Sequence, residues 1–290
     1  MRAVIGLGAL AWLAVAVACG TADITPAPVP SRVDAAEEAP SETSTDASTG
    51  DGGRSDGSAS KDGSSFDAPS SFDGGGYAAI EGLSGPAFRT ALKTLISGHT
   101  SLGYDGARDV MLGVTGNFDL TGGMLECVYT GKKAAPDGTR TPNGFNTEHT
   151  WPQSLGAGSE PARSDLHHLF PVDELANNAR GNLPFAATSC TSACAYDNGG
   201  SRKGPLLGGV EEVFEVRPVR RGDVARALFY FAVRYNLSIE AFEETALRSW
   251  HDSDAPDAVE QARNDAIEAY QKNRNPFVDR PDFVAKIADY

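Results

Sequence analysis

The two stretches that decide the fold are FNTEHTWPQS at residues 145–154 and DLHHLFPVDELANNAR at residues 165–180. The first predicts a short strand that ends before Pro152, because proline lacks the amide hydrogen that a strand interior needs. It also places a carboxylate, Glu148, directly beside His149. Neighbouring side chains of a strand point to opposite faces, so these two groups would approach a common site from different sides.

The second stretch predicts a strand over residues 165–170, which Pro171 ends, and then a helix over residues 172–180. Leu175 and Ala179 have the spacing of residues that face inward from this helix. Three polar residues line up on its other side: Asp173, Asn177 and Arg180. The order of strand, loop, strand and helix therefore aims polar side chains at one place.

The rest of residues 77–290 predicts a single, mainly helical α+β domain with short strands and long loops. Apolar spacing predicts helices over residues 84–98, 223–235 and 256–271, the last with a proline in its first turn. The inward residues of the first two are Phe88, Leu92, Leu95, Val224, Leu228, Phe231 and Tyr235. A strand is predicted within residues 123–132. Its inward face comprises Leu125, Cys127 and Tyr129.

The N-terminus predicts export. Residues 1–18 contain Arg2 and then an apolar run that ends in small residues, which is typical of a signal peptide. The run is too short to favour a retained transmembrane helix. Cleavage could follow Ala18, or the AVAC sequence could act as a bacterial lipobox with Ala16 where leucine is usual. Cys19 would then be lipidated, so the protein is expected to be secreted, periplasmic or an outer-membrane-anchored lipoprotein.

A low-complexity linker follows over residues 19–76, rich in Ser, Asp, Gly, Ala, Thr and Pro, and it is expected to be disordered. It contains 11 acidic and three basic residues, a net charge of −8. Arg2 adds +1, so residues 77–290 carry −7 of the total charge of −14. The linker could lift the domain off a surface or act only as a spacer.

Four cysteines leave the disulfide pattern open. Cys190 and Cys194, in CTSAC, could close a short loop in an oxidising compartment, and a bridge from Cys127 to either of them is the competing pairing. One short cysteine pair is too few for a four-ligand structural zinc site.

The sequence NTEHTWPQS, followed by SDLHHLFPVDELANNARGNLPF, resembles the bacterial endonuclease I family of secreted, metal-dependent, nonspecific nucleases. The segments GDVARALFYFAVRY and RNDAIEAYQKNRNPFVDRP resemble the same family, so the resemblance covers roughly residues 80–285. It implies a catalytic core of the ββα-metal, or His-Me finger, type.

The resemblance also implies a role for individual residues. His149 matches the general base that takes a proton from the attacking water. Glu148 and Asn177 match the ligands of one divalent ion, for which Mg²⁺ suits the oxygen ligands and Mn²⁺ or Ca²⁺ could compete. Arg180 would hold the scissile phosphate, and Arg163 is a second candidate for that contact.

Four further residues of the matching stretches are expected to support the site. Strand alternation would turn only one of His167 and His168 toward it, and which one is left open. Asp165 could fix a histidine tautomer or cap a backbone turn. Asn182 lies just beyond the predicted helix and is a candidate for a supporting or phosphate contact.

An acidic nuclease needs local positive charge to attract phosphates. Residues 130–221 contain ten acidic and ten basic residues, and gathering the bases around the site would form a positive channel. Those bases are Lys132, Lys133, Arg140, Arg163, Arg180, Arg202, Lys203, Arg217, Arg220 and Arg221. We expect a monomer that cleaves double- and single-stranded DNA, and RNA as a second substrate, without sequence specificity and with 5′-phosphate products.

Two other functions are weighed against the nuclease. A zinc hydrolase of peptides or esters could use His149, His167 and His168, although histidines on adjacent strand positions make poor joint ligands. A surface lipoprotein could bind extracellular DNA without turnover. The predicted positions of a nuclease site are all filled, which favours an enzyme.

Overall fold

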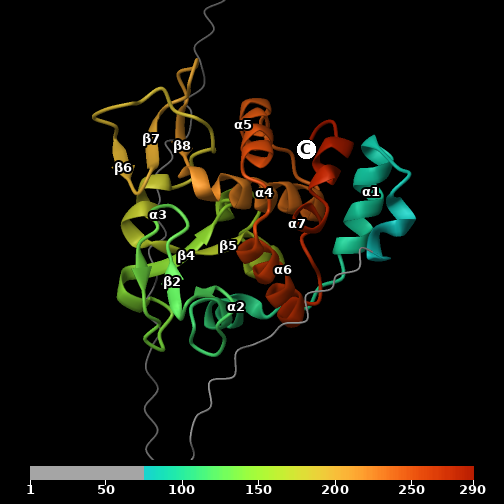
Figure 1. Cartoon of the computed structure of the whole chain (residues 1–290), viewed down its shortest axis with the longest axis horizontal. Helices are drawn as coiled ribbons and strands as arrows, with labels where there is room; N and C mark the ends of the chain where they lie inside the picture. The colour runs from blue at the N-terminus through green and yellow to red at the C-terminus, as the bar shows by residue number, and fades with distance from the viewer. Residues whose placement is uncertain (1–74) are drawn as a thin grey trace, which may run out of the picture. The chain divides into compact units, whose positions relative to one another are not determined.

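The computed structural model describes residues 75–290, which hold helices and three small antiparallel sheets (Figure 1). Residues 1–18, Cys19 and nearly all of the predicted linker lie outside this part. Helices and short antiparallel strands occur together, which confirms the α+β class. None of the helices in the described part is long and apolar enough to cross a membrane.

Strands β4 (Phe145–His149) and β5 (Leu169–Asp173) form a two-stranded antiparallel sheet. Phe145 lies opposite Asp173 and His149 lies opposite Leu169. Helix α3 (Glu174–Arg180) follows β5 at once, because the Asp173 side chain caps it by accepting a hydrogen bond from the backbone amide of the second helical residue at 3.0 Å. The predicted order of strand, loop, strand and helix is confirmed.

The predicted bounds of the second strand were wrong. Leu166–His168 form a 3₁₀ turn, η5, and the strand begins only at Leu169. The Asp165 carboxylate accepts from the His167 amide at 3.2 Å, and such local capping competes with strand pairing. Pro171 lies inside β5 rather than ending it. Each strand of a two-stranded sheet is an edge strand, where a proline is tolerated.

The buried face of helix α3 differs in part from the one predicted. Leu175 is 74% exposed, whereas Ala176 and Arg180 are buried. Arg180 sets the buried face, because its guanidinium donates to the Glu148 carboxylate and to two backbone carbonyls at the end of β4. Ala179 is half-buried and packs against the core as predicted, so only Leu175 departs from the predicted inward face.

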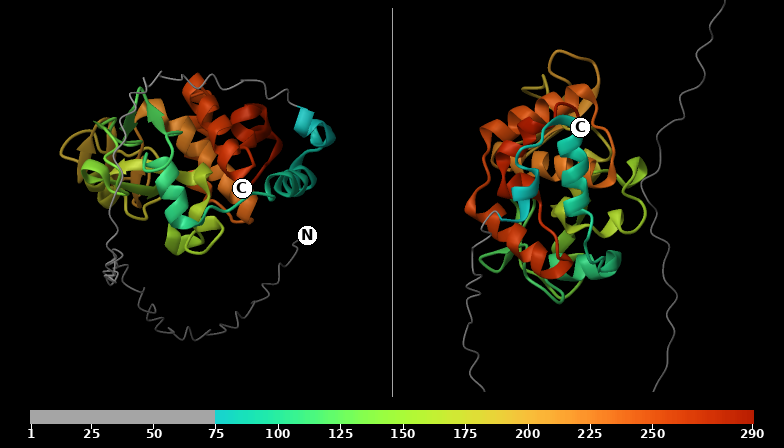
Figure 2. Two further views of the ribbon diagram at one scale, coloured as in Figure 1. Left: turned by 90° about the horizontal axis from the view of Figure 1, so that it is seen from below. Right: turned by 90° about the vertical axis from the view of Figure 1, so that its right-hand side faces the viewer.

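Helix α4 (Arg221–Tyr235) is buried on all sides, from Gly222 to Val233, and not only along the predicted stripe. It contacts α1 (Gly85–Ile96), α5 (Ala241–Ser253), α7 (Pro276–Asp279) and the 3₁₀ turn η5. Figure 2 shows these helices gathered around it. A helix that is enclosed in this way forms the centre of the core.

Two predicted helices differ from the structure in detail. The inward position near the end of α1 is Ile96, while Leu95 is 44% exposed. Helix α6 (Ala258–Gln271) begins after Asp257, whose carboxylate accepts from the amides of the second and third helical residues. Pro256 therefore precedes the helix instead of occupying its first turn.

The remaining strands form two three-stranded sheets. The first comprises β1 (Leu120–Thr121), β2 (Met124–Glu126) and β3 (Lys133–Ala134), and the second comprises β6 (Tyr196–Asn198), β7 (Ser201–Pro205) and β8 (Glu212–Glu215). The predicted strand over residues 123–132 is thus much shorter. Its three inward residues are fully buried as predicted: Leu125, Cys127 and Tyr129.

The other short elements are helix α2 (Gly103–Met111) and the 3₁₀ turns η1 (Gly75–Ile80), η2 (Pro142–Gly144), η3 (Gln153–Leu155), η4 (Ala162–Ser164), η6 (Pro218–Arg220) and η7 (Pro281–Lys286). Cys190 and Cys194 are joined in a disulfide, and Cys127 is buried with a free thiol. The short-loop pairing is the one present.

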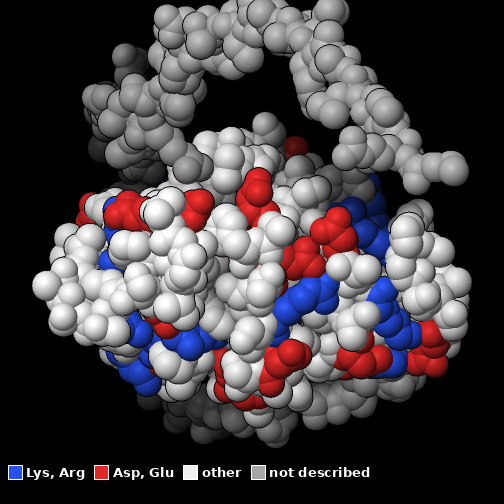
Figure 3. Space-filling view, turned by 90° about the horizontal axis from the view of Figure 1, so that it is seen from above, with Lys and Arg blue, Asp and Glu red and all other residues white. Residues whose placement is uncertain are grey.

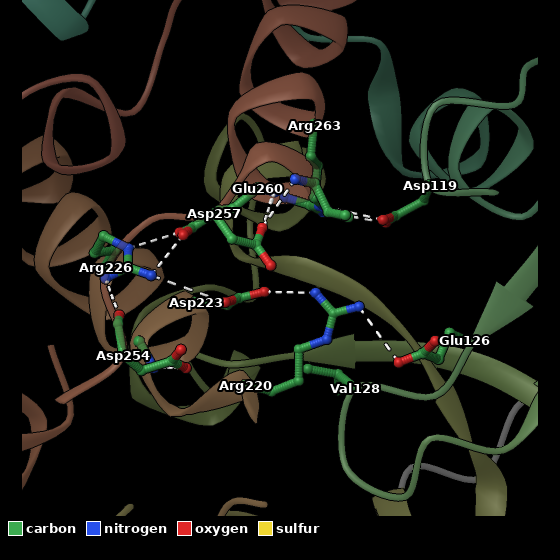
Figure 4. A network of polar contacts seen from close by, with 12 residues as sticks. Asp119, Glu126, Val128, Arg220, Asp223, Arg226, Asp254, Asp257, Glu260 and Arg263 are labelled. Atoms are coloured by element: carbon green, nitrogen blue, oxygen red, sulfur yellow. Dashed lines mark hydrogen bonds and ion pairs between the residues drawn. The ribbon is translucent and has the colours of Figure 1, made fainter. Parts of the chain in front are cut away.

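An ion-pair network joins the helices to the first sheet (Figure 4). Arg226, which is fully buried in α4, binds Glu260 of α6, with 2.7 Å between its Nε and the carboxylate. Arg220 bridges Asp223 and Glu126, at 2.7 and 3.4 Å. Removing one member of a buried pair leaves an uncompensated charge, so the network holds α4, α6 and β2 in one arrangement.

Candidate active site

His149 lies at the end of β4 and is 7% exposed. Its Nε2 is 3.1 Å from the backbone oxygen of Arg163. A carbonyl oxygen only accepts hydrogen bonds, so Nε2 carries the proton and Nδ1 keeps its lone pair. Burial holds the pKa of His149 well below 6.5, and a positive charge on the neighbouring His168 would lower it further. The imidazole is therefore neutral near pH 7 and able to accept a proton.

Glu148 points to the other face of the strand and is 1% exposed. Its Oε1 accepts a hydrogen bond from Arg180 Nη1 at 2.9 Å. Burial raises the pKa of Glu148, while the charge of Arg180 and the hydroxyl of Tyr129 act in the opposite direction. The alternation expected of a strand holds here, because His149 faces a different set of neighbours.

Arg180 faces the interior, with 2% of the residue exposed. Besides Glu148, it donates to the backbone oxygens of His149 at 3.0 Å and of Thr150 at 2.7 Å. Both terminal nitrogens are thus engaged within the protein. In this geometry the buried guanidinium holds the end of β4, and the expected phosphate contact of Arg180 stays a prediction.

Asn177 lies one helical turn before the arginine and is half-buried. Its Nδ2 donates to Asn146 Oδ1 at 2.9 Å and to the Thr147 oxygen at 3.3 Å. These two bonds orient the amide, and its Oδ1 accepts no hydrogen bond from the residues that the structure describes. Asn177 and Glu148 therefore present an amide oxygen and a carboxylate where α3 meets β4.

As ligands, this amide oxygen and this carboxylate would fit a magnesium-like ion better than zinc. Mg²⁺ commonly takes one or two protein oxygens and completes its shell with water and substrate phosphate. Within residues 75–290 no cluster of three or more His, Cys, Asp or Glu side chains could hold a metal ion. The Nε2 atoms of His149, His167 and His168 each lie 2.9–3.2 Å from a different backbone oxygen, so the three rings are not arranged as joint ligands of a zinc ion.

Of the second-stretch histidines, His168 is the one beside His149, with 5.3 Å between the centroids of the two rings. Its Nε2 is 2.9 Å from the Ala162 oxygen, and its Nδ1 is buried without a hydrogen-bond partner. His167 instead packs on Tyr230, with 4.5 Å between ring centroids. Burial lowers the pKa of each histidine to about 4, so both are neutral.

Asp165 is fully buried and acts as an acceptor that joins three elements. It accepts from the hydroxyls of Tyr230 and Tyr235 at 2.9 and 2.8 Å, from Gln271 Nε2 at 2.9 Å and from the His167 amide. It makes no hydrogen bond to an imidazole in the described part of the chain. Of the two roles considered, the structure places it in the capping one.

Arg163 and Asn182 have different surroundings. Arg163 is half-buried, and its guanidinium carbon lies 4.0 Å from the centroid of the Tyr104 ring. Among the described residues it makes no ion pair with a carboxylate. Asn182 is exposed in the turn after α3, and no contact brings it to His149. Tyr104 belongs to α2, outside both stretches, and nothing in the sequence motif pointed to it.

The basic residues of the middle region are mostly paired with carboxylates, which weakens the expected positive channel. Nine of the ten bind carboxylates, and the arginine that does not is Arg163. The ion pairs are Lys132–Asp173, Lys133–Glu126, Arg140–Asp109, Arg180–Glu148, Arg202–Glu215, Lys203–Glu212, Arg217–Glu126, Arg220–Asp223 and Arg221–Glu215. On the face shown in Figure 3, basic and acidic side chains are interspersed. Among these ten residues, the positive charge that no carboxylate within residues 75–290 neutralises is therefore confined to Arg163.

The profile of the Endonuclease I family matches residues 84–282. The chain belongs to this family. An extracellular ribonuclease of Bacillus amyloliquefaciens is 34% identical over 239 residues, which cover 73% of this chain and 77% of the relative. An extracellular deoxyribonuclease of Aeromonas hydrophila is 29% identical over 119 residues, 40% of this chain and 49% of the relative.

Membership of this endonuclease I family makes the protein a nucleic-acid hydrolase, which confirms the predicted class of enzyme. It also disfavours the alternative of a DNA-binding lipoprotein without turnover. The relatives named above carry the word extracellular in their names, in line with export. They divide between RNA and DNA as the named substrate.

Proposed function

We propose that this endonuclease I homologue hydrolyses phosphodiester bonds of both DNA and RNA, without sequence specificity, with one divalent ion and His149 as general base. The observation that carries the proposal is the hydrogen bond from His149 Nε2 to the Arg163 oxygen, at 3.1 Å. It leaves Nδ1 as the proton acceptor of a neutral imidazole. The products would carry 5′-phosphate ends.

In this mechanism His149 takes a proton at Nδ1 from the water that attacks phosphorus. The Arg163 carbonyl then stabilises the protonated ring, because the Nε2 hydrogen bond becomes charge-assisted. His168 packs at the edge of the same ring and restricts its orientation. Because the ring is mostly buried, its position is set before substrate binds.

Glu148 and Asn177 would hold the ion, and Mg²⁺ suits this pair of hard oxygen ligands, with Mn²⁺ or Ca²⁺ able to compete. The chemistry that such an ion supplies is neutralisation of the charge on the phosphate and on the departing 3′-oxygen. Asn146 orients the Asn177 amide through the 2.9 Å bond, and Arg180 orients the Glu148 carboxylate. These are second-layer contacts of the kind that commonly tune metal affinity.

Arg163 replaces Arg180 as the proposed phosphate contact. Its side chain is half-buried, unlike that of Arg180, and it makes no ion pair with a carboxylate in residues 75–290. Its backbone oxygen is bonded to the base, so its position in the chain is fixed relative to His149. The strand pair β4–β5 followed by α3 supports assigning this core to the ββα-metal, or His-Me finger, type.

Both nucleic acids are proposed as substrates because of how the relatives compare. The ribonuclease from Bacillus amyloliquefaciens matches twice as many residues as the deoxyribonuclease, at higher identity. RNA therefore stands beside DNA and not as a minor substrate. We also propose export of the protein, and its lipid anchor at Cys19 and its monomeric state remain predictions.

The test is cleavage of a supercoiled plasmid and of a labelled RNA by the full chain. We expect both substrates to be cut, activity to stop with a chelator and Mg²⁺ to restore it. His149→Ala, Glu148→Ala and Asn177→Ala should each lose cleavage, whereas the control His99→Ala should retain it. If His149→Ala cuts at the wild-type rate, the proposed base is wrong.

A further inference from the structure

An aromatic residue from outside the motif stands at the active site. Helix α2 packs on the η4 turn, and its Tyr104 ring centroid lies 5.5 Å from that of His149. The guanidinium carbon of Arg163 lies 4.0 Å from the same Tyr104 centroid. A tyrosine, an arginine and the base, from three separate elements, thus meet at one point.

Arg163 is held at both of its ends. Its backbone oxygen is bonded to His149 Nε2, and its guanidinium lies over the tyrosine ring. The Nε atom is buried and makes no hydrogen bond, so the ring face is the contact that fixes the inner part of the guanidinium. No carboxylate of the described residues competes for its charge, in contrast to the nine other bases of residues 130–221.

We propose that Tyr104 is a positioning residue, whose ring holds the Arg163 guanidinium beside His149 in the orientation that meets a substrate phosphate. The inference rests on the proposed roles of His149 and Arg163. A guanidinium that stacks by its face keeps the N–H donors of its edge for a phosphate. An arginine already held in one rotamer also loses less conformational entropy on binding than a free one.

A second arginine adds charge at the same ring. Arg108 lies one turn further along α2, with its guanidinium carbon 5.2 Å from the Tyr104 centroid. Its Nη2 donates to the Arg140 backbone oxygen at 3.2 Å, which ties it away from the base. Two guanidinium groups thus lie near the Tyr104 ring, and Arg163 is the one whose backbone oxygen is bonded to His149.

The experiment measures kcat and KM separately on a labelled DNA duplex and a labelled RNA for Tyr104→Leu, Tyr104→Phe, Arg163→Ala and the Tyr104→Leu/Arg163→Ala double variant. A cation–π pair of this kind corresponds to about a two- to thirtyfold effect. Tyr104→Leu should lower kcat/KM by about tenfold, and Tyr104→Phe, which keeps the ring face, should stay within about twofold of wild type.

The double variant should be no worse than Arg163→Ala alone, because the tyrosine acts through that arginine. Arg280→Ala is the matched control for loss of one positive charge, since its guanidinium also stacks on an aromatic ring, 4.6 Å from the Phe283 centroid. It should cleave at the wild-type rate. Should Tyr104→Leu fail to fold, Arg163→Lys replaces it, and we expect a several-fold loss because lysine keeps the charge without the planar stack.

The inference is overturned if Tyr104→Phe is as impaired as Tyr104→Leu, if the two single effects multiply in the double variant, or if Arg163→Lys is fully active. These outcomes are distinct from a failure of the proposed function. Loss of cleavage in His149→Ala with full activity in Arg163→Ala would overturn the positioning role of Tyr104 and the phosphate contact of Arg163, and leave His149 as the proposed base. Wild-type cleavage by His149→Ala would overturn both.

Discussion

Replacing Arg180 by methionine tests whether this arginine holds the site together or binds substrate. Methionine keeps much of the side chain's length and removes all its donors. Three bonds are lost, to Glu148 at 2.9 Å, to the His149 oxygen at 3.0 Å and to the Thr150 oxygen at 2.7 Å. Glu148 would remain as a carboxylate that is 1% exposed and has no cationic partner at hydrogen-bond distance.

Removing one partner of a buried ion pair costs about 3–5 kcal/mol of the free energy of unfolding, because the other charge is left in a poorly solvated position. We expect a loss of this size for Arg180→Met. Glu148→Gln should cost less, since the amide can still accept a hydrogen bond from the arginine. The Arg180→Met/Glu148→Gln double variant should be about 2 kcal/mol more stable than the sum of the single losses predicts.

The assay is urea unfolding followed by tryptophan fluorescence, with a chelator present so that metal binding does not contribute to stability. The reasoning is refuted if Arg180→Met unfolds within about 1 kcal/mol of wild type, or if the two losses add within about 0.5 kcal/mol. A variant of unchanged stability with a raised KM would restore Arg180 as the phosphate contact, in place of Arg163.

Three further predictions concern single contacts. Asp165→Ala should lower the free energy of unfolding by about 3 kcal/mol in urea titrations, since two tyrosine hydroxyls, the Gln271 side-chain amide and the His167 backbone amide lose a buried charged acceptor. Unchanged stability with lost cleavage would instead give Asp165 a role in orienting a histidine. Leu175→Ser should change stability by no more than about 0.5 kcal/mol, because the side chain is 74% exposed, and a loss above about 2 kcal/mol would show that it packs inward. The Cys190→Ser/Cys194→Ser double variant should lose at most about 2 kcal/mol of the free energy of unfolding, because a sequence separation of 4 closes only a short loop. Cleavage should be retained under reducing conditions, and loss of activity at unchanged stability would give the loop a direct part in the site.

Local patterns were sufficient for the elements that depend on nearby residues. The strand at Phe145–His149, a helix that ends at Arg180 and the long helix α4 follow from proline positions and apolar periodicity, whereas Asp173, predicted inside the helix over residues 172–180, is its cap. Glu148 and His149 are neighbours in the chain, and alternation along a strand is enough to predict that their side chains lie on opposite faces. The spacing of Cys190 and Cys194 was enough to propose a disulfide between them. It was not enough to decide against a bridge from Cys127 to either of them.

Long-range polar contacts explain the expectations that failed. Apolar spacing placed Leu175 inward, yet the buried arginine of the same helix turned that residue to solvent. The capping of η5 by Asp165 moved the second strand, and nine ion pairs took up the charges expected to form a channel. Each outcome depends on which carboxylate or carbonyl lies within hydrogen-bond distance in space.

The sequence by itself determined which residues could act, since a carboxylate, a histidine and a helical amide in this order are written along the chain at Glu148, His149 and Asn177. Only the tertiary structure decided their states. Burial keeps the His149 ring neutral and the Arg163 carbonyl directs its Nε2, which leaves Nδ1 for the proposed proton transfer, and the packing of α2 brings Tyr104 to that arginine. The protonation state and pairing of a charge depend on solvent exclusion and on neighbours distant in sequence, which no local pattern records.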